Sequence, residues 1–173
     1  MKKPAQAELF ERILIAGSGG QGIILLGRLL ANAALNRAPH LTFFPNYGAE
    51  VRGGTSHCQV ILSSREIASP VASRFESMVV MDQASADKFL PNLVPGGMAV
   101  VNRSLCSTAP SPNINLIPGT EEANRLGDTR VANLIMLGAL IARRPCIPAP
   151  QIEESIRHML NRKQPELVAL NIK

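Results

Sequence analysis

The stretch Arg12-Ile-Leu-Ile-Ala-Gly17-Ser-Gly-Gly-Gln-Gly22 decides the fold of this chain. Its apolar beginning predicts a buried strand, and the residues from Gly17 onward carry the spacing Gly-x-Gly-x-x-Gly. A run rich in Leu, Ile and Ala follows from Gln21 to about Asn36 and predicts a helix. A strand, a glycine turn and a helix in this order begin a βαβ unit. Such glycines permit a tight turn and let a phosphate approach the backbone at the start of a helix.

Further strands and helices alternate along the rest of the chain. Pro45 is expected to end the second strand. Asp82 is expected to cap the helix predicted at 83–90, and residues 95–97 are expected to form a turn. The alternation predicts an α/β fold, a single Rossmann-like domain with a mostly parallel sheet and helices on both faces. The predicted strands are 12–16, 40–44, 57–62, 77–81, 98–102 and 114–117, with a short extended piece at 67–70, and the predicted helices are 21–36, 83–90, 120–126, 131–143 and 151–161.

Length and composition bound the class of protein. The chain has 173 residues, enough for one domain with its own core, and 46% of them are hydrophobic, as in globular proteins. Within this domain we expect an N-terminal extension at 1–11, the Rossmann-like part at 12–144 and a C-terminal helical tail at 145–173. The longest apolar run, 131–142, is too short to cross a bilayer.

The cysteines give no sign of a metal site. Cys58, Cys106 and Cys146 lie about 40 to 50 residues apart, and no Cys-x-x-Cys or Cys/His cluster is present. Zinc and iron–sulfur clusters therefore have no local ligand set, and we expect no metal on this chain. An odd number of cysteines without a signal peptide is typical of a reduced, cytoplasmic protein.

The positive charge is spread along the chain. The formal net charge is +5, from 18 Lys and Arg against 13 Asp and Glu, and the chain has no Trp and one Tyr. Proteins that bind single-stranded nucleic acid combine clustered charge with aromatic stacking platforms, so nucleic acid is not expected as a partner. Diffuse basicity instead favours an anionic small molecule or an acidic protein partner.

The glycine turn leaves open whether a dinucleotide binds. A nicotinamide site needs an Asp or Glu at the end of the second strand, about 20 residues after the turn, to hold the ribose hydroxyls. This chain has Phe43-Phe-Pro-Asn46 there, and Glu50 comes later, in a different loop. A stand-alone NAD(P)-dependent oxidoreductase is therefore an alternative that the sequence disfavours.

Two predicted helices are apolar on nearly every side. Residues 23–35 carry Arg28 as their only charge, and residues 131–142 carry no charge, with Asn133 as a polar exception. Such helices must be buried nearly all round. A small domain covers one of them easily, whereas two predict help from a neighbouring chain.

Two stretches together resemble the γ subunit of 2-oxoacid:ferredoxin (acceptor) oxidoreductases, the pyruvate, 2-oxoglutarate and 2-ketoisovalerate enzymes. The first is Ile15-Ala-Gly-Ser-Gly-Gly-Gln-Gly-Ile-Ile-Leu-Leu-Gly-Arg28, and the second is Tyr47-Gly-Ala-Glu-Val-Arg-Gly-Gly-Thr-Ser56. The later pieces Ile67-Ala-Ser-Pro70 and Val79-Val-Met-Asp82 are also similar. The resemblance covers about residues 12–142.

The resemblance implies a subunit without catalytic residues of its own, inactive when isolated. In that family, thiamine diphosphate lies on α and β subunits, and iron–sulfur clusters pass electrons to ferredoxin or another acceptor, in some complexes through a ferredoxin-like δ subunit. Coenzyme A, the co-substrate, takes the acyl group. This chain lacks a thiamine diphosphate motif and cluster ligands. It is expected to shape the active-site cleft and to help bind coenzyme A.

Two candidate binding segments follow from the resemblance. In the first, the glycines would hold a phosphate of coenzyme A with Gln21 donating, or would only form the turn. In the second, Arg52 offers a forked donor to a phosphate or carboxylate, or pairs with Glu50 or the α chain. The first segment consists of Gly17, Gly19, Gly20, Gln21 and Gly22. The second consists of Tyr47, Glu50, Arg52, Gly53, Gly54, Thr55 and Ser56.

Other possibilities remain at this point. His57 and Cys58 are neighbours in a predicted strand and therefore face opposite sides, which argues against a catalytic pair. The small subunit of indolepyruvate oxidoreductase is an alternative, because other chains form most of the substrate pocket. A scaffold that binds no small molecule is another. The 2-oxoacid itself is not determined by the sequence.

Overall fold

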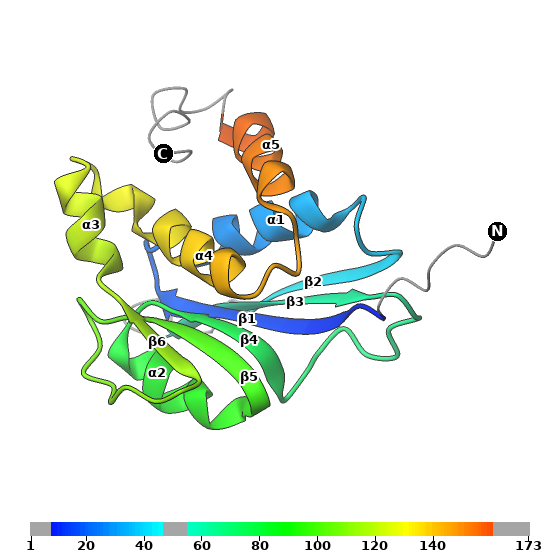
Figure 1. The fold of residues 1–173 in the computed structure, drawn as a ribbon, viewed down its shortest axis with the longest axis horizontal. Helices are drawn as coiled ribbons and strands as arrows, with labels where there is room; N and C mark the ends of the chain where they lie inside the picture. Colours follow the sequence, from blue (N-terminus) through cyan, green and yellow to red (C-terminus); the bar gives the residue numbers. More distant parts are fainter. Residues whose placement is uncertain (1–7, 47–54, 161–173) are drawn as a thin grey trace.

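The computed structural model describes residues 8–46 and 55–160, which form a sheet with helices on both faces (Figure 1). The elements in chain order are β1 (Phe10–Ser18), α1 (Ile23–Ala34), β2 (His40–Asn46), β3 (Thr55–Ser63), β4 (Phe75–Val80), α2 (Gln83–Phe89), the 3-10 helix η1 (Leu90–Asn92), β5 (Leu93–Asn102), β6 (Ile114–Ile117), α3 (Gly119–Arg125), the 3-10 helix η2 (Thr129–Val131), α4 (Ala132–Arg143) and α5 (Ala149–Leu160).

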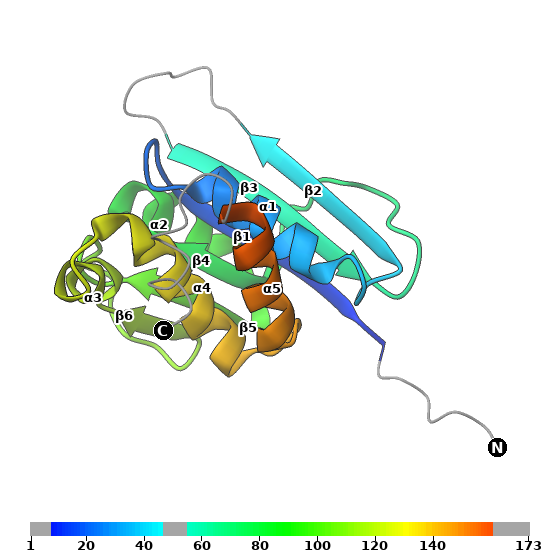
Figure 2. The same ribbon diagram turned by 90° about the horizontal axis from the view of Figure 1, so that it is seen from above.

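The sheet is mostly parallel, as predicted, with one reversed strand. Across the described residues the strand order is β2-β3-β1-β4-β5-β6, and Figure 2 shows β2, β3 and β1 side by side. Strands β1, β4, β5 and β6 run parallel to one another. Strand β3 runs antiparallel to both of its neighbours, β1 and β2. The sequence did not predict this reversal.

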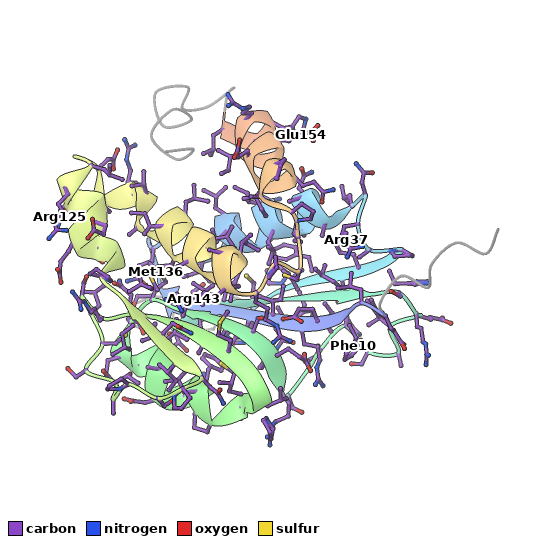
Figure 3. All side chains as sticks on the ribbon, viewed as in Figure 1. Phe10, Arg37, Arg125, Met136, Arg143 and Glu154 are labelled. Atoms are coloured by element: carbon purple, nitrogen blue, oxygen red, sulfur yellow. The ribbon has the colours of Figure 1, made fainter. Side chains whose placement is uncertain are left out.

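The central strand β1 is buried from both sides. Successive side chains of a strand point to opposite faces, so Ile13 and Ile15 pack under α1, α4 and α5, whereas Leu14 and Ala16 pack on the α2 side. All four are fully buried. In the same core, Met136 lies between α4 and the sheet (Figure 3). The predicted covering of both faces by helices is therefore confirmed.

Helix α1 lies unusually close to the sheet because residue 27 is glycine. A Cβ atom at Gly27 would lie 2.3 Å from Cys58 Sγ and 2.8 Å from the Phe43 ring. The Cys58 thiol also donates to the carbonyl of Ile23 over 3.4 Å. The first helix of the βαβ unit is thereby fixed against β3 and β2.

The two apolar helices have different surroundings. Helix α1 is covered by α4 and α5 of the same chain, and the Ser155 hydroxyl of α5 donates to the α1 carbonyl of Leu29 over 2.9 Å. Helix α4 turns Leu134, Ile135 and Gly138 toward an open apolar groove of about 780 Å³ between α3, α4 and α5. Most of the apolar surface of α1 is therefore covered within the chain, with Leu25 left exposed, while one side of α4 stays open among the described residues.

Ion pairs hold the edge of the sheet where the parallel strands begin. Glu11 is 5% exposed, accepts from Arg144 Nε over 2.6 Å and also accepts from the Ser77 hydroxyl. Beside it, Arg12 Nη2 lies 2.5 Å from Glu76 Oε1, and this contact raises the pKa of Arg12. The end of α4 is thereby tied to the start of β1.

Some predicted boundaries are wrong. Strand β1 begins at Phe10, inside the expected extension. Strand β2 continues through Pro45 to Asn46, because an edge strand tolerates proline. The expected turn at 95–97 lies inside β5 as an irregularity of its pairing with β4, where Gly96 has φ +75°. Residues 67–70 form bends and no strand. Among the described residues, no helix is long and apolar enough to cross a membrane.

Two alanine substitutions at helical glycines should have opposite effects on stability. Gly27→Ala should lower the free energy of unfolding by about 1–3 kcal/mol, because the new methyl group collides with Cys58 and Phe43. Gly138→Ala should raise it by about 0.5–1 kcal/mol, because nothing lies within 4 Å of a Cβ there and alanine favours the helix. Urea denaturation of both variants measures this, and equal effects would contradict the close approach of α1.

Candidate functional site

The glycine turn joins β1 to α1 at the edge where the parallel strands end. Gly20 and Gly22 have φ values of +90° and +73°, in the left-handed region that favours glycine. The Gln21 side chain closes the turn, because its Oε1 accepts from the backbone N–H of Ser18 over 2.8 Å. Its Nε2 group is therefore the donor that Gln21 can offer to a ligand.

The physical reason why a glycine is needed differs from one position of the turn to the next. A Cβ at Gly17 would lie 2.4 Å from Gln21 Oε1, and a Cβ at Gly22 would lie 2.3 Å from Asn133 Nδ2, so packing and backbone conformation explain these two. Gly20 is explained by its positive φ. Gly19 has neither a positive φ nor any atom within 4 Å of its would-be Cβ. The fold alone therefore does not require glycine at position 19.

The reversed strand brings the second segment to the same place. Thr55 and Ser56 begin β3 and pair with Ser18 and Gly17 at the end of β1. Because β3 runs antiparallel to β1, its first residues lie beside the glycine turn. The described end of the second segment therefore lies beside the glycine turn. The remaining predicted residues of the second segment, Tyr47, Glu50, Arg52, Gly53 and Gly54, lie outside the described residues.

The turn also lies at the point where the chain changes faces of the sheet. After β1 the chain enters α1 on one face, and after the neighbouring β4 it enters α2 on the other. Ligands of open α/β sheets bind in the crevice that this arrangement leaves. Asp82 lies there, accepts from the Ser18 hydroxyl over 2.5 Å, and caps α2 by accepting from the N–H of Ser85 over 2.8 Å. The predicted cap is confirmed.

A pocket of about 380 Å³ opens beside the turn and contains polar residues that sequence reasoning did not assign. Asn133 of α4 is 5% exposed and donates to the carbonyl of Gly22 over 3.4 Å. Thr120 also lines the pocket, and its Oγ1 accepts over 2.9 Å from Asn102, which is fully buried and does not itself line the pocket. The signal for Asn133 was its place as a lone polar residue in an apolar helix. The pocket is lined by Gly20, Gln21, Gly22, Leu25, Met81, Leu105, Thr120, Thr129, Arg130, Ala132, Asn133, Leu134 and Leu160.

Positive charge lies on both sides of the turn. Arg130 lines the pocket and pairs with Asp128, with Nη2 and Oδ2 2.6 Å apart, and the hydrogen bonds from Arg130 lower the pKa of Asp128. On the α2 side, Lys88 Nζ donates to Thr55 Oγ1 over 3.3 Å. An anion at the turn would therefore meet backbone N–H groups and the charge of Lys88, since the charge of Arg130 is paired with Asp128.

The cysteines are poorly suited to nucleophilic or metal chemistry. Burial raises the pKa of Cys58 to about 12 and those of Cys106 and Cys146 to about 11, so their thiols stay protonated near neutral pH. His57 faces α2 and Cys58 faces α1, as predicted. Among residues 8–46 and 55–160, no three His, Cys, Asp or Glu side chains are grouped so as to hold a metal ion.

These features define a Rossmann-like domain with a glycine turn at the start of α1. Strand β2 ends at Asn46, so the domain lacks the ribose carboxylate of a nicotinamide site at that position. Residues 12–173 match the family described as pyruvate ferredoxin/flavodoxin oxidoreductase. The chain belongs to this family, and the resemblance drawn from the sequence is confirmed.

Three relatives illustrate the match. Ketoisovalerate oxidoreductase subunit VorA of Methanothermobacter thermautotrophicus is 36% identical over 132 residues, which are 76% of this chain and 28% of VorA. The keto/oxoacid ferredoxin oxidoreductase γ subunit of Geobacter sulfurreducens has a TM-score of 0.78 and 26% identity, covering 94% of both chains. The 2-oxoglutarate:ferredoxin oxidoreductase of Magnetococcus marinus has a TM-score of 0.82 and 24% identity, covering 94% of this chain and 29% of that chain.

The three relatives differ in how much of their own length this chain covers. The chain spans little more than a quarter of VorA and of the Magnetococcus chain, but nearly all of the Geobacter γ subunit. Its length and fold therefore correspond to those of the Geobacter γ subunit. These relatives give no support to an indolepyruvate-specific subunit or to a stand-alone NAD(P)-dependent enzyme.

The environment of His57 predicts a loss of stability in mild acid. Its ring packs against Phe89 with the centroids 4.8 Å apart and the ring planes tilted by 53°, and burial, then the charge of Lys88, lowers the pKa of His57 below 6.5. The unfolded chain therefore binds the proton more readily, and stability should fall as the pH drops through about 6.5. His57→Gln should reduce the difference in Tm between pH 7.5 and 5.5. The exposed His40→Gln serves as control, and an unchanged pH dependence in His57→Gln would refute the assignment.

Proposed function

We propose that this chain acts within a 2-oxoacid:ferredoxin (or other acceptor) oxidoreductase complex and that its glycine turn binds a phosphate of coenzyme A. Such a complex oxidatively decarboxylates a 2-oxoacid and transfers the acyl group to the thiol of coenzyme A. The Magnetococcus marinus enzyme is described with 2-oxoglutarate, coenzyme A and succinyl-CoA bound. Its chain shares the fold of this domain, which makes the same edge of the sheet the natural place to look.

The open space at Gly19 is the observation that carries the proposal. Packing or backbone conformation explains the other glycines of the turn, whereas Gly19 presents bare backbone to an empty region. Helix α1 starts at Ile23, with Gly22 as an N-cap residue that offers no side-chain hydrogen bond, and it has no acidic residue in its first turn. Its first N–H groups are therefore suited to a phosphate, which accepts hydrogen bonds and is favoured by the helix dipole.

The redox chemistry is proposed to lie on partner chains. Cys58 and Cys106 lie on opposite faces of the sheet, so the described cysteines do not fit an iron–sulfur cluster. We propose that α and β subunits, and in some assemblies a ferredoxin-like δ subunit, hold thiamine diphosphate and the clusters. Because Cys58, Cys106 and Cys146 are free thiols, a cytoplasmic location fits best.

Within that complex, this chain would hold and orient the co-substrate. The backbone of the turn and Gln21 Nε2 would bind a phosphate, and Lys88 would add positive charge beside Thr55. Arg52 would provide a forked donor from the second segment. The reactive thiol of coenzyme A must reach an active site on another chain, so this chain acts by positioning and takes no part in proton or electron transfer.

Substitution at Gly19 separates phosphate binding from turn formation. Gly19→Val should leave the free energy of unfolding within about 0.5 kcal/mol, because no heavy atom lies within 4 Å of a Cβ at this position and the φ of Gly19 is not positive. In the assembled complex it should raise the KM for coenzyme A about tenfold or more, since the side chain blocks the approach of the phosphate. The KM for the 2-oxoacid should not change.

Asn36→Ala, an exposed change at the other end of α1, is the matched control. Arg52→Ala should raise the same KM if the second segment shares the ligand. An unchanged KM for coenzyme A in Gly19→Val would instead support a scaffold that binds no small molecule.

The partners can be found directly. Affinity purification of the tagged chain from its native source should recover chains that bind thiamine diphosphate and iron–sulfur clusters, read by mass spectrometry and metal content. Activity of the recovered complex on pyruvate, 2-oxoglutarate, 2-ketoisovalerate and indolepyruvate identifies the substrate. A stable lone chain that turns over a nicotinamide substrate would exclude the proposal.

A further inference from the structure

Asn133 is a polar residue in a place where packing alone would choose an apolar one. It occupies the second position of α4, whose other side chains are apolar up to Arg143, and only 5% of its surface is exposed. Burial of an amide is unfavourable unless it forms hydrogen bonds. Its presence therefore indicates that its hydrogen bonds matter.

Those hydrogen bonds lead to the glycine turn. Asn133 Nδ2 donates to the carbonyl of Gly22 over 3.4 Å, and the same carbonyl accepts from the N–H of Leu26 over 2.9 Å as the first bond of α1. Asn133 Oδ1 accepts from the N–H of Leu134 over 2.7 Å, which fixes which way the amide points. The contact is close enough that a Cβ on Gly22 would lie 2.3 Å from Nδ2.

Helix α4 can hold the turn because its two ends make contacts at opposite ends of β1. Arg144, directly after α4, pairs with Glu11 at the start of β1, with Nε and Oε1 2.6 Å apart. Asn133, at the start of α4, contacts Gly22, which follows the end of β1. Helix α4 therefore spans the length of the strand, and its position determines where the carbonyl of Gly22 lies.

We infer that Asn133 is a positioning residue for the phosphate site. Gly20 and Gly22 make the turn possible, but glycine is the most freely rotating residue, and the turn needs an external contact to keep one shape. Asn133 supplies that contact with a neutral amide and so adds no negative charge beside the anion. The inference rests on the proposed binding of coenzyme A at this turn.

Two substitutions in the assembled complex test the inference. Asn133→Asp keeps the shape but turns a carboxylate oxygen toward the Gly22 carbonyl, and should raise the KM for coenzyme A about tenfold. Asn133→Ala removes the contact without adding charge and should raise it about threefold. The kcat and the KM for the 2-oxoacid should stay unchanged in both. Asn124→Ala, an exposed asparagine of α3, is the matched control.

A purely structural role would give a different result. Asn133 variants with a lower Tm but an unchanged KM for coenzyme A would overturn the inference, provided that Gly19→Val raises that KM. If Gly19→Val also leaves the KM unchanged, the proposed phosphate site itself is wrong. The two failures are therefore distinguishable.

A double-mutant cycle covers the case in which Asn133→Asp does not assemble. Gly22→Ala introduces a methyl group that collides with Asn133 Nδ2, so Asn133→Ala should relieve part of its effect. The double variant should then bind coenzyme A no more weakly than Gly22→Ala alone. Strictly additive effects on the KM would show that the two residues act independently and would reject the inference.

Discussion

The functional edge of this protein depends on the hydrogen bonding of β1, which lies between an antiparallel β3 and a parallel β4. The antiparallel ladder places Thr55 and Ser56 opposite Ser18 and Gly17. If β3 ran parallel to β1, its first residues would lie at the other edge, about 30 Å away for a strand of nine residues. The two segments, which have residues 23–46 between them in the chain, then could not belong to one site.

The two edges of the sheet are held by different chemistry. Where the parallel strands begin, the contacts are the ion pairs Arg12–Glu76 and Glu11–Arg144. Where they end, the amides of Gln21, Asn102 and Asn133 hold the turns by hydrogen bonds. Amides hold a backbone as well as carboxylates do but carry no charge. The negative charge of the proposed ligand would therefore be met by N–H groups and by Lys88, while the Asp82 carboxylate accepts from Ser18 and from the start of α2.

The sequence predicted strands and helix caps, which depend on neighbouring residues. It did not predict strand direction or contacts between residues far apart in the chain. Apolar runs predicted β1 and β4, and the place of Asp82 directly before a helical stretch identified it as a cap. Each of these signals is contained in a few consecutive residues. Side-chain alternation indicates which face a residue occupies but carries no information on strand direction, so the reversal of β3 could not be predicted. Pro45 was misread because its tolerance depends on β2 being an edge strand. The partner of Asn133 lies 111 residues away in the chain.

The inserted strand also explains why a glycine turn of this type need not bind a nicotinamide dinucleotide. In a domain where the second strand pairs directly with the first, a carboxylate at its end lies one strand spacing, about 4.8 Å, from the turn. Here β3 lies between β1 and β2, which doubles that distance to about 10 Å. The place of the ribose carboxylate is taken by the hydroxyls of Thr55 and Ser56. The topology thus keeps the phosphate-binding part of the motif and removes the part that selects a dinucleotide.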